Sequence, residues 1–196
     1  MPDFLRALDL SSLADQIGQR AAGLPRPFLV AIDGRSGSGK STLAARLTER
    51  LPAALLDGDG FFAGGTALRC DSPEQRAHDC IDWRAQRTVI ERLRGGHSAS
   101  YHAFDWEAFD GSRMAETTIV EARPVILLEG VYSARPELAD LLDLRLLLRV
   151  SDELRRARLR AREHGLGPWD LQWHEAEEWY FAQRAPLASF DFVVDG

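Results

Sequence analysis

A glycine-rich stretch with a single lysine is the part of this chain best suited to bind phosphate. Residues 34–41 read Gly-Arg-Ser-Gly-Ser-Gly-Lys-Ser, which matches the pattern G-x-x-x-x-G-K-S/T in full. Lys40 is the only lysine among the 24 lysine and arginine residues. A phosphate-binding loop needs a compact ammonium on a flexible stem, whereas a guanidinium is a broad planar fork. The sequence therefore predicts an anion site at Lys40, with a chance glycine-rich turn as the alternative.

Each position of this stretch has a predicted role. Glycines let the backbone turn and approach an anion without a Cβ in the way, and the N–H groups at a helix start favour negative charge. Lys40 would reach the β- and γ-phosphates, and the Ser41 hydroxyl would ligate Mg²⁺. The motif thus implies a nucleotide and Mg²⁺ as ligands. The predicted nucleotide-binding residues are Gly34, Ser36, Gly37, Ser38, Gly39, Lys40, Ser41 and Thr42.

Two aspartates follow the second predicted strand, in the run Asp57-Gly58-Asp59-Gly60. Because parallel strands present their carboxyl ends at one edge of a sheet, these side chains should lie near the phosphate loop. A carboxylate there could accept the proton of an attacking hydroxyl, as phosphoryl transfer to an alcohol requires. Either aspartate fits this role, and a turn built on the Asp-Gly pairs is the alternative.

Arginines at one helical spacing form a third candidate group. Arg155, Arg158 and Arg162 share one face of a helix predicted for 152–163. Arginines can stabilise the charge of a transferring phosphoryl group, so we expect one or two of them to act in catalysis. The alternative is a solvated helix face.

The elements around these residues alternate between strand and helix. The apolar run 28–32 leads directly into the glycine stretch, and a helix is predicted over 41–51. This alternation predicts an α/β fold with a parallel sheet covered on both faces. The other predicted elements are a helix within 4–22, strands at 53–56, 117–120, 125–128, 144–150 and 190–194, and helical segments at 73–94 and 170–184.

Composition narrows the class of protein. The 196 residues suffice for one domain, and the 45% hydrophobic and 28% charged fractions are ordinary for a globular protein. No segment approaches the ~18 apolar residues that span a bilayer, and no leader pattern opens the chain, so we expect a cytoplasmic protein. A net charge of −6 argues against nucleic-acid or membrane partners. Cys70 and Cys80 are predicted to be reduced thiols.

Three ordered motifs resemble the uridine kinase family of phosphate-loop kinases. They are the loop at 34–42, Asp-Gly-Phe-Phe at 59–62 and Leu-Glu-Gly-Val at 128–131. The wider group includes phosphoribulokinase, bacterial pantothenate kinase and nicotinamide riboside kinase, and the resemblance covers about residues 28–195. It implies a P-loop NTPase fold with a helical lid at about 152–170. The helix that apolar spacing predicts within residues 1–26 precedes this core.

The resemblance also implies a function. The chain would transfer the ATP γ-phosphoryl group to a hydroxyl of a small molecule, a nucleoside-like substrate being the first choice. Another alcohol, such as pantothenate, a sugar or an antibiotic, is an alternative acceptor. From a different class, a regulatory ATP-binding protein without kinase activity is the second alternative. A homo-oligomer is compatible with the sequence.

The same resemblance assigns residues on the acceptor side. Asp59 matches the family's general base, and Phe62 stands where many members have tyrosine. Asp82 resembles an aspartate that holds ribose hydroxyls, although capping the next helix explains it equally well. Tyr101 resembles an aromatic residue that packs on the substrate base. Trp106 either lines the substrate pocket or packs on the core.

Two further assignments concern the metal and the lid. Glu129 corresponds to an acidic residue that helps hold Mg²⁺, with capping of a neighbouring helix as the alternative. Arg158 and Arg162 match the R-x-x-x-R spacing of the lid helix best. The stretch 101–106 lacks the histidine and arginine that the family carries there. That departure concerns the acceptor and leaves the phosphate side of the site unaffected.

Overall fold

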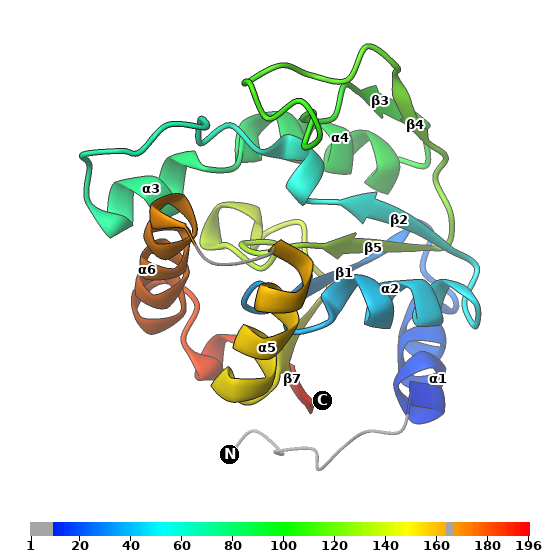
Figure 1. Ribbon diagram of the computed structural model, residues 1–196. Helices are drawn as coiled ribbons and strands as arrows, with labels where there is room; N and C mark the ends of the chain where they lie inside the picture. The colour runs from blue at the N-terminus through cyan, green and yellow to red at the C-terminus, as the bar shows by residue number, and fades with distance from the viewer. Residues whose placement is uncertain (1–9, 164–166) are drawn as a thin grey trace.

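A five-stranded sheet in which all neighbouring strands are parallel forms the centre of the molecule (Figure 1). The computed structural model describes residues 10–163 and 167–196, and of 162 and 163 the backbone alone. The strand order β2-β5-β1-β6-β7 places the strand before the phosphate loop in the middle. The strands are β1 Phe28–Asp33, β2 Ala53–Asp57, β5 Val125–Glu129, β6 Leu144–Arg149 and β7 Phe192–Asp195.

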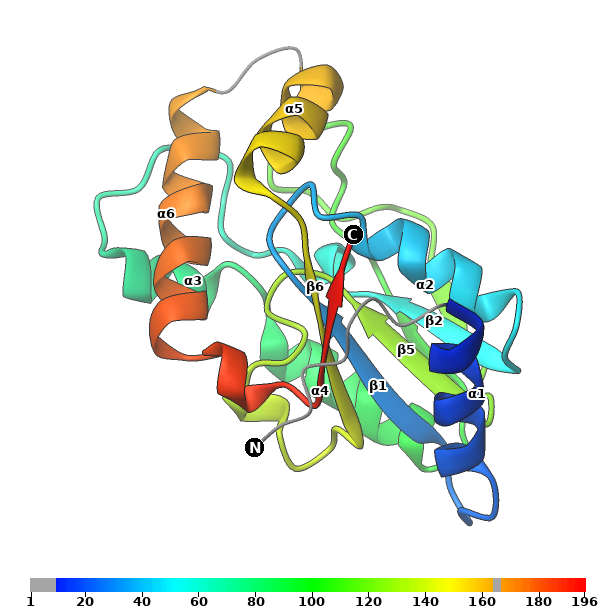
Figure 2. The ribbon, with the colours of Figure 1, turned by 90° about the horizontal axis from the view of Figure 1, so that it is seen from below.

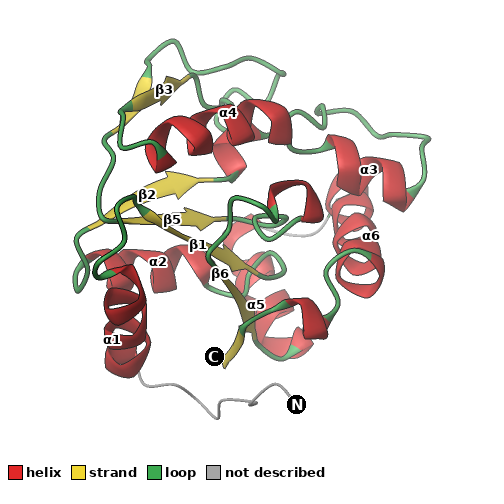
Figure 3. Ribbon diagram, turned by 180° about the vertical axis from the view of Figure 1, so that it is seen from behind, coloured by secondary structure: helices red, strands yellow, loops and turns green. Residues whose placement is uncertain are grey.

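Helices cover both faces of this sheet. Figures 1 and 3 show α1 and α2 on one face and α4 on the other, with α3 and α6 together at one end. The predicted α/β class, with helices on both faces, is confirmed. The helices are α1 Leu10–Ala21, α2 Lys40–Thr48, α3 Pro73–Asp79, α4 Trp83–Arg94, α5 Asp152–Glu163 and α6 Pro168–Gln183.

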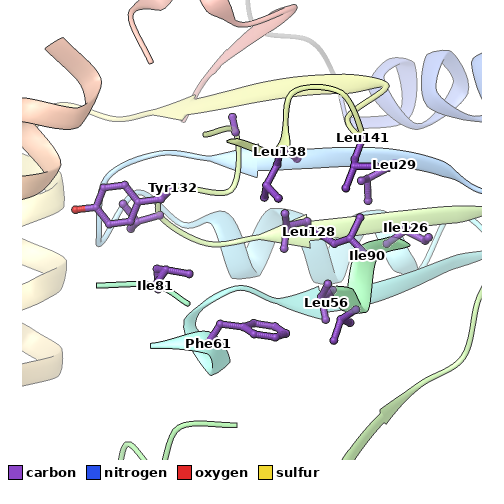
Figure 4. Packing of buried hydrophobic residues seen from close by; sticks show 14 of the residues in the cluster. Leu29, Leu56, Phe61, Ile81, Ile90, Ile126, Leu128, Tyr132, Leu138 and Leu141 are labelled. Atoms are coloured by element: carbon purple, nitrogen blue, oxygen red, sulfur yellow. The ribbon is translucent and has the colours of Figure 1, made fainter. Parts of the chain in front are cut away.

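Alternation along β1 divides the core between the two faces. Val30 and Ile32 pack with α1 and α2, whereas Leu29 and Ala31 face the cluster on the opposite side, and all four are fully buried. Strand side chains alternate between faces, so a buried middle strand must be apolar throughout. Figure 4 shows the cluster that contains Leu29, which lies beside residues of β5 and of the loop that follows β5.

Two segments differ in detail from the sequence prediction. The single helical segment expected at 73–94 is split into α3 and α4, because Ile81 pairs with Phe62 as an isolated bridge and Asp82 caps α4. The loop expected at 97–113 contains β3, Ala99–Tyr101, which pairs with β4, Thr118–Val120, in an antiparallel ribbon. Neither local pairing has a strong periodic signal in the sequence. Both pack against the edge of the molecule that carries Asp59.

The carboxyl ends of the middle strands bring acidic residues into register. Glu129 at the end of β5 pairs with Ile32 of β1 on one side and with Asp57 of β2 on the other. The phosphate loop follows β1 at this same edge, and α5 follows β6 there (Figure 2). The sheet therefore positions the predicted acidic and phosphate-binding residues together. Within the described ranges, none of the helices has the length and apolar character needed to cross a membrane.

Candidate functional site

The glycine stretch folds as a tight loop that ends at the first residue of α2. Gly34, Gly37 and Gly39 have φ of 151°, 80° and 102°, in the region that favours glycine. Lys40 opens α2, so the loop's amides and the helix N-terminus point to the same place. The strand, loop and helix that the sequence predicts are therefore present.

Gly34 shows why this loop tolerates no side chain at its start. A Cβ added there would meet the Leu148 carbonyl oxygen at 2.4 Å, in addition to the positive φ. We expect Gly34→Ala to lower the free energy of unfolding by about 2–5 kcal/mol, because strain and overpacking add. Gly96→Ala is the control, since Gly96 has φ +80° but no atom within 4 Å of the added Cβ. Urea unfolding measures both, and equal losses would contradict the packing argument.

One cavity of about 230 Å³ brings the predicted phosphate-side residues together. Its lining combines the loop with residues of β5, η1 (Asp59–Phe61) and α5. The fold thus brings together residues as far apart in the sequence as Ser36 and Leu159. The lining residues are Ser36, Gly37, Gly39, Lys40, Ser41, Thr42, Asp59, Glu129, Arg158 and Leu159.

Carboxylates gather at one part of this cavity, beside Lys40. Burial, together with the nearby charges of Asp59 and Asp57 and against the opposing charge of Lys40, raises the pKa of Glu129 to about 7. Burial likewise raises the pKa of Asp57. Lys40 is only 7% exposed, and its Nζ lies 3.3 Å from the Arg35 carbonyl oxygen. Asp59 and Glu129 line the cavity with Asp57 beside them, and a cation bound among these carboxylates would relieve their mutual repulsion.

The oxygen donors fit Mg²⁺ that arrives with a nucleotide. Ser41 and Glu129 supply hydroxyl and carboxylate oxygens in the same cavity, which are the ligands that Mg²⁺ prefers. No group of three or more histidine, cysteine, aspartate or glutamate side chains in the described part of the chain could hold a metal ion by itself. Mg²⁺ is commonly held by one or two protein oxygens plus substrate phosphates. The residues present therefore fit Mg–ATP better than a metal bound alone.

Two arginines of α5 contact the phosphate loop, Arg158 at the cavity and Arg155 behind the loop. Arg158 is exposed, and its Nη1 donates to the carbonyl oxygens of Ser38 at 2.9 Å and Gly37 at 3.4 Å. Arg155 is 4% exposed and lies behind the loop, with Nη1 3.5 Å from the Ser36 carbonyl oxygen. The Arg162 side chain lies outside the described residues, as does the part of the predicted lid at 164–166.

Phe62 and Trp106 lie in an aromatic cluster beside Asp59. Phe62 is 1% exposed and its ring centre is 4.9 Å from that of Trp106. Trp106 is 42% exposed, and its indole N–H donates to the Asp59 carbonyl oxygen at 3.3 Å. Trp106 thus packs on the core and also keeps an exposed part next to Asp59. The aromatic cluster comprises Phe62, Phe104, Trp106, Phe109, Trp169 and Trp173.

Asp82 and Tyr101 occupy structural positions next to the same 3₁₀ turn. Asp82 caps α4, because its Oδ1 accepts from the Ala85 N–H at 3.0 Å. Tyr101 stacks on Phe61 with ring centres 4.4 Å apart. Burial, together with the nearby charge of Asp57, raises the pKa of Tyr101 to about 12. The capping alternative for Asp82 is therefore realised, and a role of either residue in acceptor binding stays a prediction.

Asp33 is a site residue that sequence reasoning missed. It is fully buried, and its oxygens accept from the N–H groups of Gly34, Tyr132 and Ala134 and from the Tyr180 hydroxyl, at 2.8–3.0 Å. It thereby joins the phosphate loop to the segment after Glu129. The only signal in the sequence is its place directly before the first glycine of the loop.

A parallel sheet whose middle strand runs into a phosphate loop, with carboxylates at or just after the ends of neighbouring strands, is the arrangement of P-loop NTPases. Comparison with known families agrees: the model of the phosphoribulokinase / uridine kinase family matches residues 29–164. The chain belongs to this family. It is accordingly a phosphotransferase with an alcohol group as acceptor.

Individual relatives extend this result. A uridine kinase from Clostridium perfringens is 24% identical over 147 residues, which cover 71% of this chain and 70% of the relative. A possible uridine kinase from Bacillus stearothermophilus has the same fold, with a TM-score of 0.69 at 20% identity over 95% of this chain and 97% of that one. A putative fructose transport system kinase from Silicibacter sp. TM1040 reaches a TM-score of 0.70 at 26% identity, covering 95% and 99%.

Proposed function

We propose that this protein transfers the γ-phosphoryl group of ATP, with Mg²⁺, to a hydroxyl of a nucleoside-like small molecule. The observation that carries the proposal is the single cavity in which Lys40, Ser41, Asp59, Glu129 and Arg158 meet. It contains a phosphate cradle, metal-binding oxygens and a carboxylate within one space. The proposal treats the chain as one kinase domain with its lid region at α5.

The residues have distinct roles in this reaction. When bound, Mg–ATP supplies the transferable phosphoryl group. Lys40 and Arg158 stabilise negative charge that develops on that group, and the loop amides orient it. Ser41 and Glu129 hold the metal. Asp59 accepts the proton of the attacking hydroxyl, since it faces the same cavity.

A second cavity supports the placement of the nucleotide. It measures about 590 Å³ and shares Gly39, Thr42 and Arg158 with the first, so the two are adjacent. Arg46 of α2 and Asp195, the last residue of β7, also line it. This space is suited to the nucleoside half of ATP, while the phosphates reach Lys40. The acceptor then approaches at Asp59, which lines the first cavity and not the second.

The acceptor has two candidate classes. The curated relative named above is a uridine kinase, which favours a nucleoside. The altered stretch 101–106 and the relative described as a fructose transport system kinase favour a sugar as second candidate. Aromatic side chains such as Trp106 stack on a base and also pack against the apolar face of a sugar ring.

A panel of acceptors tests the proposal. The purified protein with Mg–ATP should release ADP at least tenfold faster with a uridine- or sugar-type alcohol than without one, and mass spectrometry should show the product monophosphate. EDTA should abolish the activity. ADP release that no hydroxyl compound stimulates, or nucleotide-dependent partner binding without phosphorylation, would favour the regulatory alternative.

Arg158 gives a more local prediction. Replacing it with alanine should lower kcat about 10- to 100-fold, because one charge-stabilising donor is lost from the transition state. The matched control is Arg156→Ala, an exposed arginine of the same helix that does not line the cavity. Steady-state kinetics with saturating ATP measure both variants. Equal kcat values for the two variants would remove Arg158 from the mechanism.

A further inference from the structure

Helix α6 contacts the phosphate loop through a fully buried carboxylate. Glu177 is 0% exposed, and its Oε1 accepts from the Ser36 main-chain N–H at 2.9 Å and from the Ser36 hydroxyl. The indole N–H of Trp173, one turn earlier on α6, lies within hydrogen-bond distance of both Glu177 Oε1, at 2.8 Å, and Ser36 Oγ, at 2.9 Å. A main-chain donor of the loop is therefore held by a side chain 141 positions away.

A second contact from the same helix face holds the start of the loop. Tyr180, three positions after Glu177, donates its hydroxyl to Asp33 Oδ2 at 2.9 Å. Asp33 in turn accepts from the Gly34 N–H at 2.8 Å. Helix α6 thus holds the loop at Asp33 and at Ser36, on either side of its first glycine.

The burial of a charged side chain at Glu177 requires compensation. A carboxylate buried without compensation costs several kcal/mol, and an apolar residue would pack the helix on the loop without that cost. Here the compensation comes from donors of the loop itself and from the guanidinium of Arg155, 3.9 Å from Oε2. A phosphate loop concentrates N–H donors and a helix N-terminus, which need an acceptor whether or not an anion is bound.

We propose that Glu177 is a positioning residue that presets the phosphate loop before nucleotide binds. Its carboxylate acts on the loop from behind, through Ser36, and keeps the remaining amides directed into the cavity. The inference rests on the proposed nucleotide site at this loop. In the free protein it requires neither nucleotide nor acceptor, so it can be tested apart from the activity.

The first test is amide hydrogen exchange of Ser36 in the nucleotide-free protein, measured by ¹⁵N NMR. Glu177→Leu should raise the exchange rate at least about tenfold, since the acceptor is lost. Glu177→Gln keeps an acceptor oxygen of the same reach and should stay within about threefold of the wild type. Glu175→Gln, an exposed residue of the same helix whose partner is Arg76, is the control and should leave the rate unchanged.

The second test is the affinity for ATP, measured by calorimetry on folded variants. Positioning predicts that Glu177→Leu weakens ATP binding about tenfold and lowers kcat, with the acceptor KM unchanged, because small displacements cost much in transfer reactions. Electrostatics alone predicts the opposite sign, since removal of a buried negative charge near phosphates should tighten binding. Tighter binding by both Glu177→Leu and Glu177→Gln, or an unchanged Ser36 exchange rate, would overturn the proposal.

A fallback variant covers the case in which Glu177→Leu does not fold. Trp173→Phe removes the indole N–H that lies against Glu177 and Ser36 but keeps an aromatic ring in the core. It should raise Ser36 exchange about threefold, and an unchanged rate counts against the proposal. Failure of the proposed kinase function would give a different result. No acceptor would be phosphorylated, yet replacement of Glu177 would still change the Ser36 exchange rate and the affinity for ATP.

Discussion

Asp59→Asn should lose turnover by about three orders of magnitude while its affinity for ATP stays within a few-fold of the wild type, since a general base contributes 10²- to 10⁴-fold. Asp59 begins the 3₁₀ turn after β2 and lines the cavity with Lys40 and Glu129. Asparagine keeps the size of the side chain but cannot take up a proton. The loss should therefore appear in kcat. Steady-state kinetics, with calorimetry for ATP, separate the two quantities.

The neighbouring aspartate supplies the control. Asp57 accepts from the Asp59 N–H at 2.9 Å and does not line the cavity. It therefore holds the backbone at Asp59 in place. Asp57→Asn should therefore lower kcat about tenfold or less. If Asp57→Asn has the larger effect, the base is Asp57 and the motif match is displaced by one turn of the backbone. Wild-type turnover in Asp59→Asn would exclude Asp59 from proton transfer.

Lys40→Arg should be nearly as inactive as Lys40→Met, with kcat/KM for ATP lowered about 10²- to 10³-fold in both, because the charge must sit at one point in a confined space. Lys40 is 7% exposed at the first turn of α2, where a planar guanidinium has little room. Arginine keeps the positive charge of lysine, but because its shape differs it should not restore the reaction. Kinetics at varied ATP concentration measure the effect.

An exposed arginine nearby provides the comparison for charge alone. Arg50 follows α2 and pairs with Glu49 at 3.7 Å, away from the cavity. Arg50→Ala should leave kcat/KM for ATP within about twofold, as is usual for an exposed ion pair. If Lys40→Arg is as active as the wild type, the absence of other lysines has no functional meaning. The tight fit at Lys40 would then also be refuted.

The phosphate side of the site was predictable because its signals are local. Ser41, Lys40 and the loop glycines are neighbours in the chain. Glu129 ends an apolar strand, and Asp59 lies two residues after the end of another. Parallel strands carry their carboxyl ends to one edge, so order along the chain sufficed to bring these residues together. Their meeting in one cavity needed no knowledge of side-chain packing.

The acceptor side could not be predicted to the same depth. Asp82 caps α4, and Tyr101 stacks on Phe61, so both have structural partners that the sequence does not reveal. Trp106 joins a cluster that draws Phe62 from the segment after β2 and Trp169 and Trp173 from α6, in addition to neighbours from its own loop. Such packing depends on side-chain shape across long separations, for which a single sequence has no periodic signal.

The sequence by itself determined the order along the chain of the five strands of the central sheet, the phosphate loop, and which acidic residues stand at or just after the ends of these strands. These features follow from backbone propensity, hydrophobic period and glycine placement, which act over a few residues. Only the tertiary structure decided that Arg155 lies behind the loop and Arg158 at the cavity. It also decided that Glu177 holds Ser36, because a hydrogen bond across 141 positions exists only once α6 has packed against the sheet.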